Sequence, residues 1–516
     1  ARTHGPFTTG AFATRYALAP AAAAAILGRL LARAQVIEGE FRPFDAAQGR
    51  PGGSEPEWCD PEVLQTIRRR SLAKLRRQVA PVEPAALGRL VTTWQGIVRR
   101  RRGLDALLDV IETLQGASIP ASLVEREILP ARIDDYKAGD LDTLASAGEI
   151  AWVGAGSLGE RDGRIALYLT DALPRLLRPS VGPGASAESA KSVANLGARE
   201  QAILVWLADR GASFFGAIHD AVGGGYPGET VDALWTLVWR GLVTNDTFHA
   251  LRAYTRPPEK RARKSSTGGR AFRSRRLAPP TAEGRWSLVA ARVRHPATPT
   301  EWSAAVAEQL LARYGVVTRE VAAAEDLPGG FSAVYEVFKA LEDRGRIRRG
   351  YFVSGVGAMQ FAEPAAVEML RSLANEPDEP EVVTIAATDP ANPYGTLLRW
   401  PDPRPQGTQM NADARSLRGA TRTVGATVIL VDGALAAWIG RGGRQLLVWL
   451  PDDEPARSRV GRPLAARLAD LARDASFGGL LIGEVNGGPA ADHPLGAFLV
   501  EAGFAPSALG FQITRH

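Results

Sequence analysis

The stretch "LPGGFSAVYEVFKALEDRGRIRRGYFVSGVGAMQFA", from Leu327 to Ala362, decides the fold. Apolar residues recur at helical spacing after Phe331, which predicts an amphipathic helix. Gly345 follows where a helix can end on a left-handed residue, because glycine has no Cβ to clash. Two strand-like runs then flank the turn Ser354–Gly357, which predicts a hairpin. Helix, turn and hairpin in this order indicate a winged helix.

A short pattern from this stretch recurs along the chain. It has Leu at the first place, Gly at the fifth in three copies, and Ile or Val at the seventh. Each copy follows a helix-like apolar stripe, so we expect four tandem winged-helix modules. The copies are "LARAQVI" from Leu31, with Gln35 at the fifth place, "LASAGEI" from Leu144 with Gly148, "LVWRGLV" from Leu237 with Gly241, and "LEDRGRI" from Leu341 with Gly345.

The pattern changes after Val382, where short apolar runs are broken by Asp-Gly and Arg-Gly-Gly, which favour hairpins. We therefore predict an α+β protein: tandem winged-helix modules, then a small antiparallel β-barrel and an α/β tail. The expected boundaries are winged helix 1 at 1–45, a helical segment with winged helix 2 at 58–175, winged helix 3 at 195–253, a basic linker at 254–284, winged helix 4 at 285–375, the β-barrel at 382–451 and the C-terminal α/β segment at 455–516.

Composition excludes several classes of protein. With 516 residues and 45% apolar content, the chain is ordinary globular material of several domains. No run of about 18 apolar residues occurs, so no membrane contact is expected. The single cysteine, Cys59, excludes an internal disulfide and a multi-cysteine zinc site, and it fits a cytoplasmic location. The first residues lack Met and an apolar signal region, so we interpret the start as lying inside a longer protein.

Nucleotide and metal motifs are also missing or incomplete. No G-x-x-x-x-G-K-[ST] motif occurs, so we expect no Walker ATP site. Gly154, Gly156 and Gly159 have dinucleotide-site spacing, but a second strand-like run follows them, which favours a hairpin turn. The six histidines never pair at a spacing of three or four, so no metal site is expected.

The basic residues are almost all arginine, since only six of the 62 are lysine. Arginine binds phosphate in two-point geometry, although a GC-rich genome also produces arginine excess. The segment Arg256–Arg276 holds nine basic residues and one acid, and it is either a solvated loop or a phosphate-binding arm. Beside winged helices the arm is favoured. The predicted DNA contacts are Arg256, Lys260, Arg261, Arg263 and Lys264 here, and Arg346, Arg348 and Arg349 in the fourth wing.

A second candidate site is "VVTIAATDPANPYGTLLRWP", Val382 to Pro401. In one interpretation a strand ends in Asp-Pro and Asn-Pro turns, with the aromatic residues in the core. In the other, the loop lines a pocket for an extruded base, and Asp389 is catalytic, stabilising charge on the sugar or activating water. The DNA contacts would then include Asn392, Tyr394, Arg399 and Trp400.

Several stretches resemble the C-terminal half of the long bacterial Lhr (large helicase-related) proteins. They include "EWCDPEVLQTIRRRSLAKLRRQV" from Glu57, the run from Leu327 to Arg371, and "AATDPANPYGTLLRWP" from Ala386. The resemblance implies the DNA-binding and oligomerisation domain of a 3′-to-5′ DNA repair helicase whose ATPase core lies upstream. It implies single-stranded or duplex DNA, RNA:DNA hybrids and a homotetramer as partners, and no cofactor here, with ATP and Mg²⁺ needed only in that core.

The resemblance also implies a fold similar to AlkZ-type DNA glycosylases, and hence a second function, removal of uracil or another damaged base. The glutamines of the AlkZ-type motif are absent, because Ala386 and Thr388 occupy those places. Asp389 is then the first choice for catalysis, with Glu484 not excluded. Whether the chain is an enzyme is left open by the sequence.

Overall fold

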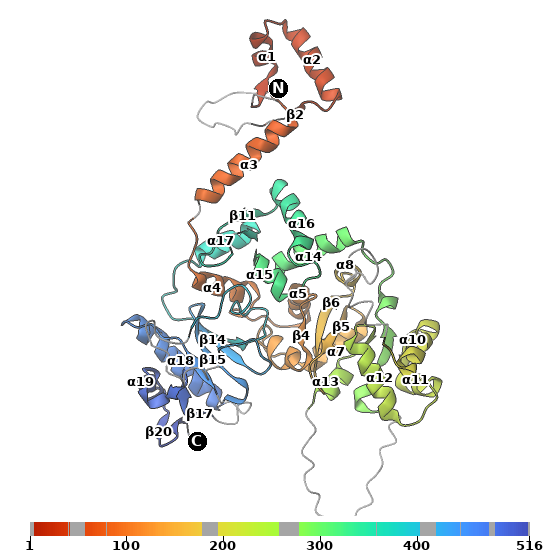
Figure 1. Cartoon of the computed structure of the whole chain (residues 1–516), viewed down its shortest axis with the longest axis vertical. Helices are drawn as coiled ribbons and strands as arrows, with labels where there is room; N and C mark the ends of the chain where they lie inside the picture. Colours follow the sequence, from red (N-terminus) through yellow and green to blue (C-terminus); the bar gives the residue numbers. More distant parts are fainter. Residues whose placement is uncertain are drawn as a thin grey trace, which may run out of the picture. The chain divides into compact units, whose positions relative to one another are not determined.

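The computed structural model describes residues 5–39, 41, 57–78, 80–177, 195–256, 278–357, 359–402, 419–443, 445–473 and 480–513. It divides into two compact units, which are described separately. The small unit is Ala1–Ala80 with Leu341–Tyr351, and the large unit is Pro81–Ala340 with Phe352–His516. Both contain helices and short antiparallel strands, so the predicted α+β class is confirmed (Figure 1).

The small unit is built on a three-stranded sheet. Strand β3 (Glu57–Cys59) pairs with both β1 (Phe7–Thr8) and β2 (Ile37–Gly39), so the sheet of the first module extends beyond residue 45. Buried Leu27, Val36 and Trp58 form its core. Its other elements are α1 (Thr9–Arg15), α2 (Pro20–Ala32), α3 (Pro61–Gln78) and β11 (Arg348–Gly350).

The glycine that ends three of the repeats has the predicted left-handed conformation. Its φ is 83° at Gly148, 71° at Gly241 and 73° at Gly345. In the second copy, the Gly148 N–H bonds to the Ala145 carbonyl and the Glu149 N–H to the Leu144 carbonyl, both at 3.1 Å. These two bonds satisfy carbonyls that the helix end leaves open, and the chain turns directly into a strand.

In the first copy the predicted register is wrong by one residue. Ala34, not Gln35, takes the left-handed place, with a φ of 54°. The Ala34 and Gln35 N–H groups bond to the carbonyls of Leu31 and Leu30, repeating the pattern of the other copies one position earlier. Burial agrees, because Val36 is 1% exposed whereas Leu31 is 39% exposed. Alanine tolerates this conformation at a cost, so the glycine pattern misplaced this turn.

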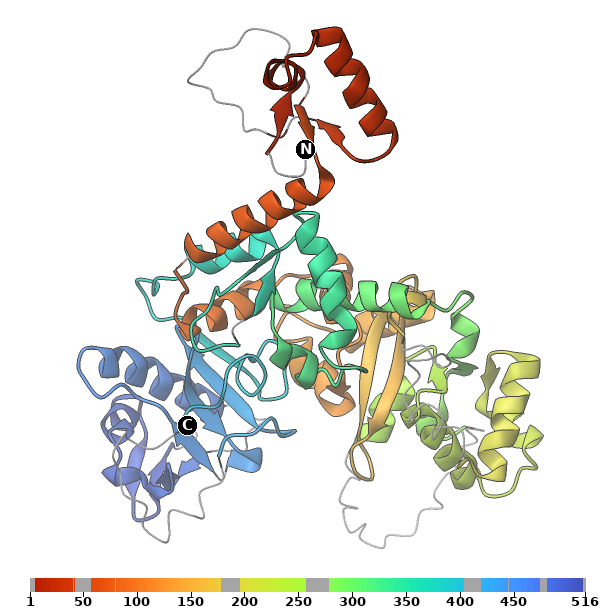
Figure 2. The ribbon, with the colours of Figure 1, turned by 45° about the horizontal axis from the view of Figure 1, so that its top comes forward.

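Modules two and three share one hydrophobic core in the large unit. Buried Trp152, Trp235 and Trp286 come from both modules and lie in one hydrophobic cluster. A Cβ at Gly154 would overlap the Val238 carbonyl oxygen, so the first glycine of the dinucleotide-like spacing serves close packing. The elements are α5 (Leu104–Leu114), β4 (Ile119–Pro120), α7 (Ala138–Ala147), β5 (Ile150–Ser157), β6 (Gly163–Leu169), α10 (Ala198–Arg210), β7 (Ser213–Phe214), α11 (Phe215–Ala221), α12 (Pro227–Trp239), β8 (Val243–Asn245) and β9 (Arg285–Leu288). Strand β5 of module two contacts α12 and β8 of module three, and the two modules lie side by side in Figure 2.

Strand β9 alters the predicted boundary between modules three and four. It pairs antiparallel with both β7 and β8, so it completes the sheet of module three. The segment 254–284 is therefore an insertion within module three, whereas the sequence predicts a linker before a fourth module starting at 285. A strand can pair across an intervening segment, and the local pattern did not indicate this partner.

Module four begins with α14 (Pro299–Tyr314). Thr298 and Glu301 form a capping box at its start, which satisfies two N–H groups that the helix leaves open. The sheet strands β10 (Val316–Val317) and β12 (Gln360–Ala362) pair antiparallel. The other helices are α15 (Arg319–Ala324), α16 (Ser332–Asp343) and α17 (Pro364–Ser372), and α4 (Pro84–Trp94) packs on α17.

The sheet after Val382 is open within the described residues, so the predicted β-barrel is not found. Its order is β13 (Val382–Ala386), β14 (Thr427–Val431), β15 (Ala434–Ile439) and β16 (Leu446–Val448). The expected Asp-Gly turn is present, with φ of 50° at Asp432 and 77° at Gly433. The tail packs on this sheet through α18 (Ala456–Arg473) and α19 (Leu495–Glu501). Its strands are β17 (Leu481–Ile482), β18 (Glu484–Val485), β19 (Gly488–Pro489), β20 (Ala505–Ser507) and β21 (Gly510–Gln512).

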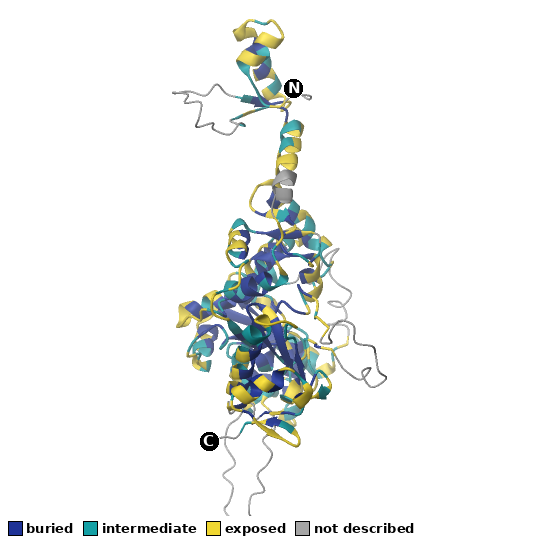
Figure 3. Ribbon diagram, turned by 90° about the vertical axis from the view of Figure 1, so that its left-hand side faces the viewer, coloured by how far each residue is buried: buried dark blue, intermediate teal, exposed yellow. Residues whose placement is uncertain are grey.

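Burial follows the strands, which are mostly dark blue in Figure 3, whereas many helices expose one face. Of the helices described, none is by itself long and apolar enough to cross a membrane. One bent pair, Thr9–Arg15 with Pro20–Ala32, meets the requirement on length and composition alone.

Candidate nucleic-acid interface

A pocket of about 1040 Å³ lies in the large unit. We call it the arginine-lined pocket, because five arginines and two carboxylates line it. Phosphates carry the opposite charge, and arginine recognises them with paired N–H groups, so this excess suits a polyanion. The lining is Ala121, Ser122, Glu125, Arg126, Tyr136, Ala138, Leu158, Arg161, Asp162, Phe248, Leu251, Arg252, Thr255, Arg256, Val424, Gly425, Arg441 and Gly442.

Two short helices bring charges to the pocket. The π-helix η2 (Val124–Ile128) follows α6 (Ala121–Leu123) and carries Glu125 and Arg126. Its wide turn is closed by a 2.9 Å bond from the Leu129 N–H to the Val124 carbonyl. Such π-turns occur frequently at functional sites. Helix α13 (His249–Thr255) adds Arg252 and, at its end, Arg256.

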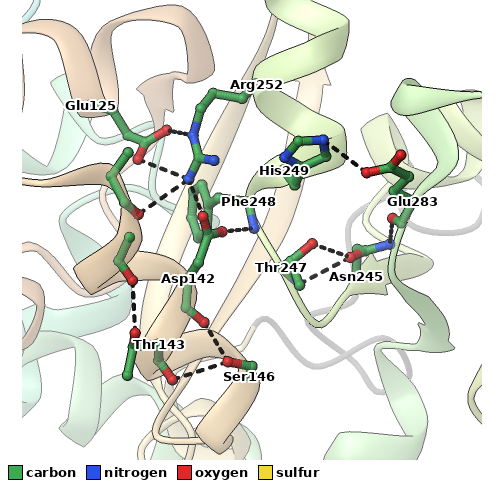
Figure 4. Close-up of polar contacts among 12 residues, drawn as sticks. Glu125, Asp142, Thr143, Ser146, Asn245, Thr247, Phe248, His249, Arg252 and Glu283 are labelled. Carbon is green, nitrogen blue, oxygen red and sulfur yellow. Dashed lines mark hydrogen bonds and ion pairs between the residues drawn. The ribbon is translucent and has the colours of Figure 1, made fainter.

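Arg252 ties three elements together at one side of the pocket (Figure 4). Its guanidinium donates to Glu125 at 2.5 Å, to Asp142 at 2.8 Å and to the Ala138 carbonyl at 3.3 Å. Burial lowers the pKa of Arg252, but the hydrogen bonds that it donates to Glu125 and Asp142 outweigh this effect, so the pKa is raised. Arg252 therefore acts as a fixed cation that positions α13, and part of its charge is already neutralised.

Glu125 also accepts a hydrogen bond from the Tyr136 hydroxyl at 2.7 Å. Burial, followed by the nearby negative charge of Glu125, raises the pKa of Tyr136 well above its usual value. Tyr136 therefore remains a neutral hydrogen-bond donor throughout the physiological pH range. Because Arg252 and Tyr136 donate to its two oxygens, the Glu125 carboxylate is fixed in position.

Polar contacts also fix the start of α13 (Figure 4). The Phe248 N–H donates to Asp142 at 2.9 Å, and the Thr247 N–H donates to Asn245 at 3.0 Å. Asn245 in turn donates to the Glu283 carbonyl at 3.0 Å, and the carboxylate of Glu283 lies 2.8 Å from His249 Nε2. These bonds hold α13, and with it Arg252, in a defined position.

Asp162 lies in the turn between β5 and β6, the wing of module two. It accepts hydrogen bonds from the Ser122 hydroxyl at 2.5 Å, the Ser122 N–H at 3.1 Å and the Gly163 N–H at 2.9 Å. No ion pair joins Asp162 to another residue of the described chain. Its carboxylate is thus oriented by neutral donors and not by a cation.

Four arginines at the pocket are exposed. Arg126 pairs with Glu127 at 2.6 Å, yet its side chain remains 63% exposed. Arg161, Arg256 and Arg441 are exposed and form no ion pair within the described part of the chain. These three guanidinium groups are available to bind phosphate.

Asp389, the predicted catalytic residue, does not line this pocket and is 0% exposed. Its two carboxylate oxygens accept from Arg132 at 2.7 and 3.0 Å, and the Ala391 N–H donates to it at 2.7 Å. Arg132 also donates to Gln95 at 2.6 Å. A catalytic role for Asp389 stays a prediction, but this closed ion pair fits a structural role.

The loop after Asp389 has the geometry of a strand that ends in a turn. Asn392 is 0% exposed, donates to the Ala387 carbonyl at 2.9 Å and accepts from the Tyr394 N–H at 3.1 Å. Tyr394 stacks on Trp400 with 6.1 Å between ring centroids. Burial raises the pKa of Tyr394. Buried groups such as Asn392 present no edge to DNA in this arrangement.

Arg422 closes the same loop from its other side. Its guanidinium donates to the carbonyls of Thr388, Asp389, Asn392 and Tyr394, at 2.9 to 3.2 Å. We call Arg132, Asp389 and Arg422, with the carbonyls they bind, the buried arginine clamp. Of the four DNA contacts predicted here, Arg399 is exposed and Trp400 is half-buried.

The remaining predicted contacts are scattered. Arg256 lines the pocket, whereas Lys260, Arg261, Arg263 and Lys264 lie outside the described residues. In the small unit, Arg346 and Arg348 are exposed, and Arg349 pairs with Glu342 at 3.2 Å.

Sequence reasoning missed most of the pocket. Its charges come from several elements distant in sequence, as single residues or close pairs, and so they formed no single local cluster. The one available signal was the pair Arg161 and Asp162 inside the predicted hairpin turn of module two. The residues missed are Glu125, Arg126, Arg161, Asp162, Arg252 and Arg441.

Comparison with known families supports the second and the fourth of the modules described. Residues 82–170 match the family model for the third winged-helix domain of the large helicase-related protein, and residues 296–382 match that for the fourth. The chain contains winged-helix domains of the Lhr family. The family resemblance indicated by the sequence motifs is confirmed.

Two curated relatives extend this likeness along the chain. A Mycolicibacterium smegmatis protein named "Lhr helicase/ probable uracil glycosylase" is 37% identical over 509 residues, which is 94% of this chain and 31% of the relative. An Escherichia coli K12 protein named "Lhr helicase/uracil glycosylase" is 35% identical over 493 residues, 88% of this chain and 30% of the relative. The chain therefore spans roughly a third of each relative's length.

Proposed function

We propose that this Lhr-related region binds DNA in the arginine-lined pocket, as part of a DNA repair helicase. The observation that supports this most strongly is the excess of five arginines over two carboxylates around one pocket. Three of these arginines form no ion pair in the described chain, so binding of phosphate would not first require breaking one. Winged-helix elements supply most of the pocket wall.

The size of the pocket favours a single strand or a nucleotide turned out of a duplex. Ligand sites commonly enclose about 300–1000 Å³, which is the scale of this pocket rather than of a whole double helix. Half-buried aromatic and apolar side chains such as Tyr136 and Leu158 line the pocket among the charges, and they offer surface to a base.

Charge reversal at the pocket tests this proposal. In the double variant Arg161→Glu with Arg441→Glu, affinity for a labelled single strand should fall by at least about tenfold, because phosphates would meet carboxylates. Fluorescence anisotropy at fixed salt measures the affinity. The matched control is Arg371→Glu, an exposed arginine on α17 that does not line the pocket. Equal affinity of the double variant and the control would contradict the proposal.

A second proposed function is removal of uracil from DNA. Two relatives carry uracil glycosylase in their names. The specific observation in its favour is that the same pocket holds carboxylates beside cations, which base excision requires for charge and water. Incubation of the chain with uracil-containing DNA, followed by alkali to cleave abasic sites, tests it. Uncleaved DNA would exclude this function.

We also propose assembly as a homotetramer, binding of RNA:DNA hybrids, a cytoplasmic location, and use of ATP and Mg²⁺ only in a separate helicase core. The family resemblance supports the tetramer, the hybrid and the separate helicase core, and the single cysteine, Cys59, fits the location. Mass photometry tests the tetramer, and a monomer at micromolar concentration would contradict it. Competition between an RNA:DNA hybrid and single-stranded DNA tests binding of the hybrid.

A further inference from the structure

We propose that Asp162 is the catalytic carboxylate of the arginine-lined pocket, which rests on the proposed uracil excision. Asp162 would accept the proton of the water that attacks the sugar of an extruded deoxyuridine. This places the chemistry in the wing of module two and not in the loop that carries Asp389.

Three carboxylates are candidates for this role, and they differ in their ion-pair partners. Glu125 lies 2.5 Å from Arg252, and Asp389 lies 2.7 Å from Arg132, so the charge of each is matched by a cation. Asp389 is also 0% exposed, which leaves no approach for water or a nucleotide. Asp162 lines the pocket and has no ion-pair partner in the described chain.

The partners of Asp162 hold its carboxylate in one orientation. Ser122 donates to it from both its hydroxyl and its N–H, and the Gly163 N–H donates as well. These donors come from α6 and from the wing itself, so they fix the carboxylate without neutralising it. A base held in one orientation reaches its water at a lower entropic cost than a mobile one.

The chemistry balances with water as the sole co-reactant. The bond between C1′ of the sugar and N1 of uracil breaks, and the base departs with the electron pair. The water oxygen forms the new bond to C1′, and Asp162 takes one of the water's protons. That proton then passes to the departing base, which gives neutral uracil and an abasic sugar.

The arginines have a defined part in this step. Negative charge develops on the departing base, and a nearby cation stabilises it. Arg161 precedes Asp162 in the wing, and both line the pocket. The reaction needs a base to take the proton of the water and a cation to stabilise the departing uracil, and Asp162 and Arg161 supply these two roles.

The test compares excision rates in a single turnover with uracil-containing single-stranded DNA. Asp162→Asn should lower the rate by about 100-fold or more, the range for loss of a general base. Its DNA affinity should stay at or above that of the original chain, because one negative charge leaves the pocket. The matched control is Asp171→Asn, an exposed aspartate outside the pocket, which should be as active as the original.

Asp389→Asn separates the two catalytic hypotheses. At a temperature where circular dichroism shows it folded, its excision rate should match that of the original chain. If Asp162→Asn keeps the full rate while the original chain excises uracil, the assignment of Asp162 is overturned and the second proposed function stands. If the original chain excises no uracil, both are overturned. Loss of rate together with loss of DNA affinity in Asp162→Asn would also overturn the assignment, since it would indicate a binding or folding role.

Discussion

The buried arginine clamp and the arginine-lined pocket use the same residue types in opposite ways. In the clamp, Arg132 and Asp389 have side chains 1% exposed, and they bond to each other and to further buried groups of the protein. In the pocket, Arg161 and Arg441 are exposed, and Asp162 is held by neutral donors. The difference shows that partners and exposure, and not residue type, separate a structural ion pair from a binding site.

The largest expected effect comes from breaking the clamp. Arg132→Met should lower the free energy of unfolding by about 3–5 kcal/mol, because Asp389 would be left charged and buried without its cation. Urea denaturation followed by circular dichroism measures this. The double variant Arg132→Met with Asp389→Leu should recover much of the loss, since no buried charge remains. If Arg132→Met lowered the free energy of unfolding by less than about 1 kcal/mol, the clamp would contribute no more stability than an exposed surface ion pair does.

A smaller effect is expected from removing one pocket arginine. Arg161→Ala should reduce the slope of log affinity against log salt by about 1, because one phosphate contact is lost with its released counterions. Stability should change little, since this side chain is exposed and forms no ion pair in the described chain. Titrations at several salt concentrations measure the slope. An unchanged slope would mean that Arg161 does not contact phosphate.

The smallest expected effect concerns pH and lies outside both regions. Burial lowers the pKa of His493, whose Nδ1 accepts the Leu495 N–H at 3.1 Å. The unfolded chain takes up this proton near pH 6.5 and the folded chain only at lower pH, so stability should fall as pH drops below about 6.5.

Replacing this histidine isolates its contribution. His493→Gln should flatten the dependence between about pH 7 and pH 5.5, whereas the same change at exposed His295 should not. Urea denaturation at each pH measures it. At each pH in this range, both variants should bind DNA with the same affinity as the original chain, because neither histidine lines the pocket.

Local signals in the sequence predicted the local structure well. The glycines of three repeats, the Asp-Gly turn and the hairpin after Gly154 are each set by backbone conformations that glycine or a turn pair favours. The first repeat was misplaced because Ala34 took a place where glycine was expected. The prediction of a β-barrel failed because hairpin patterns indicate only that neighbouring strands pair. They do not indicate whether the first and last strands pair and so close the sheet.

The site was harder to predict because its residues are distant in sequence. Asp389 looked accessible beside turn residues, but its partner Arg132 lies 257 residues away and could not be inferred from spacing. Arg161 and Arg441 likewise meet only through the fold of the large unit. Of the predicted DNA contacts, Arg256 lines the pocket. It is the first residue of the basic segment whose composition predicted phosphate binding.

The core shared by modules two and three limits how this protein can be dissected. Trp152 and Phe248 lie 5.8 Å apart between ring centroids, and Trp152 and Trp235 lie 6.5 Å apart, although they belong to different modules. A truncation that ended after module two would remove the side chains of module three that pack on this tryptophan cluster. The apolar surface left exposed would favour aggregation. A piece that keeps this cluster covered should therefore run at least from α5 through β9, and a piece that keeps the whole pocket must also include Val424 to Gly442.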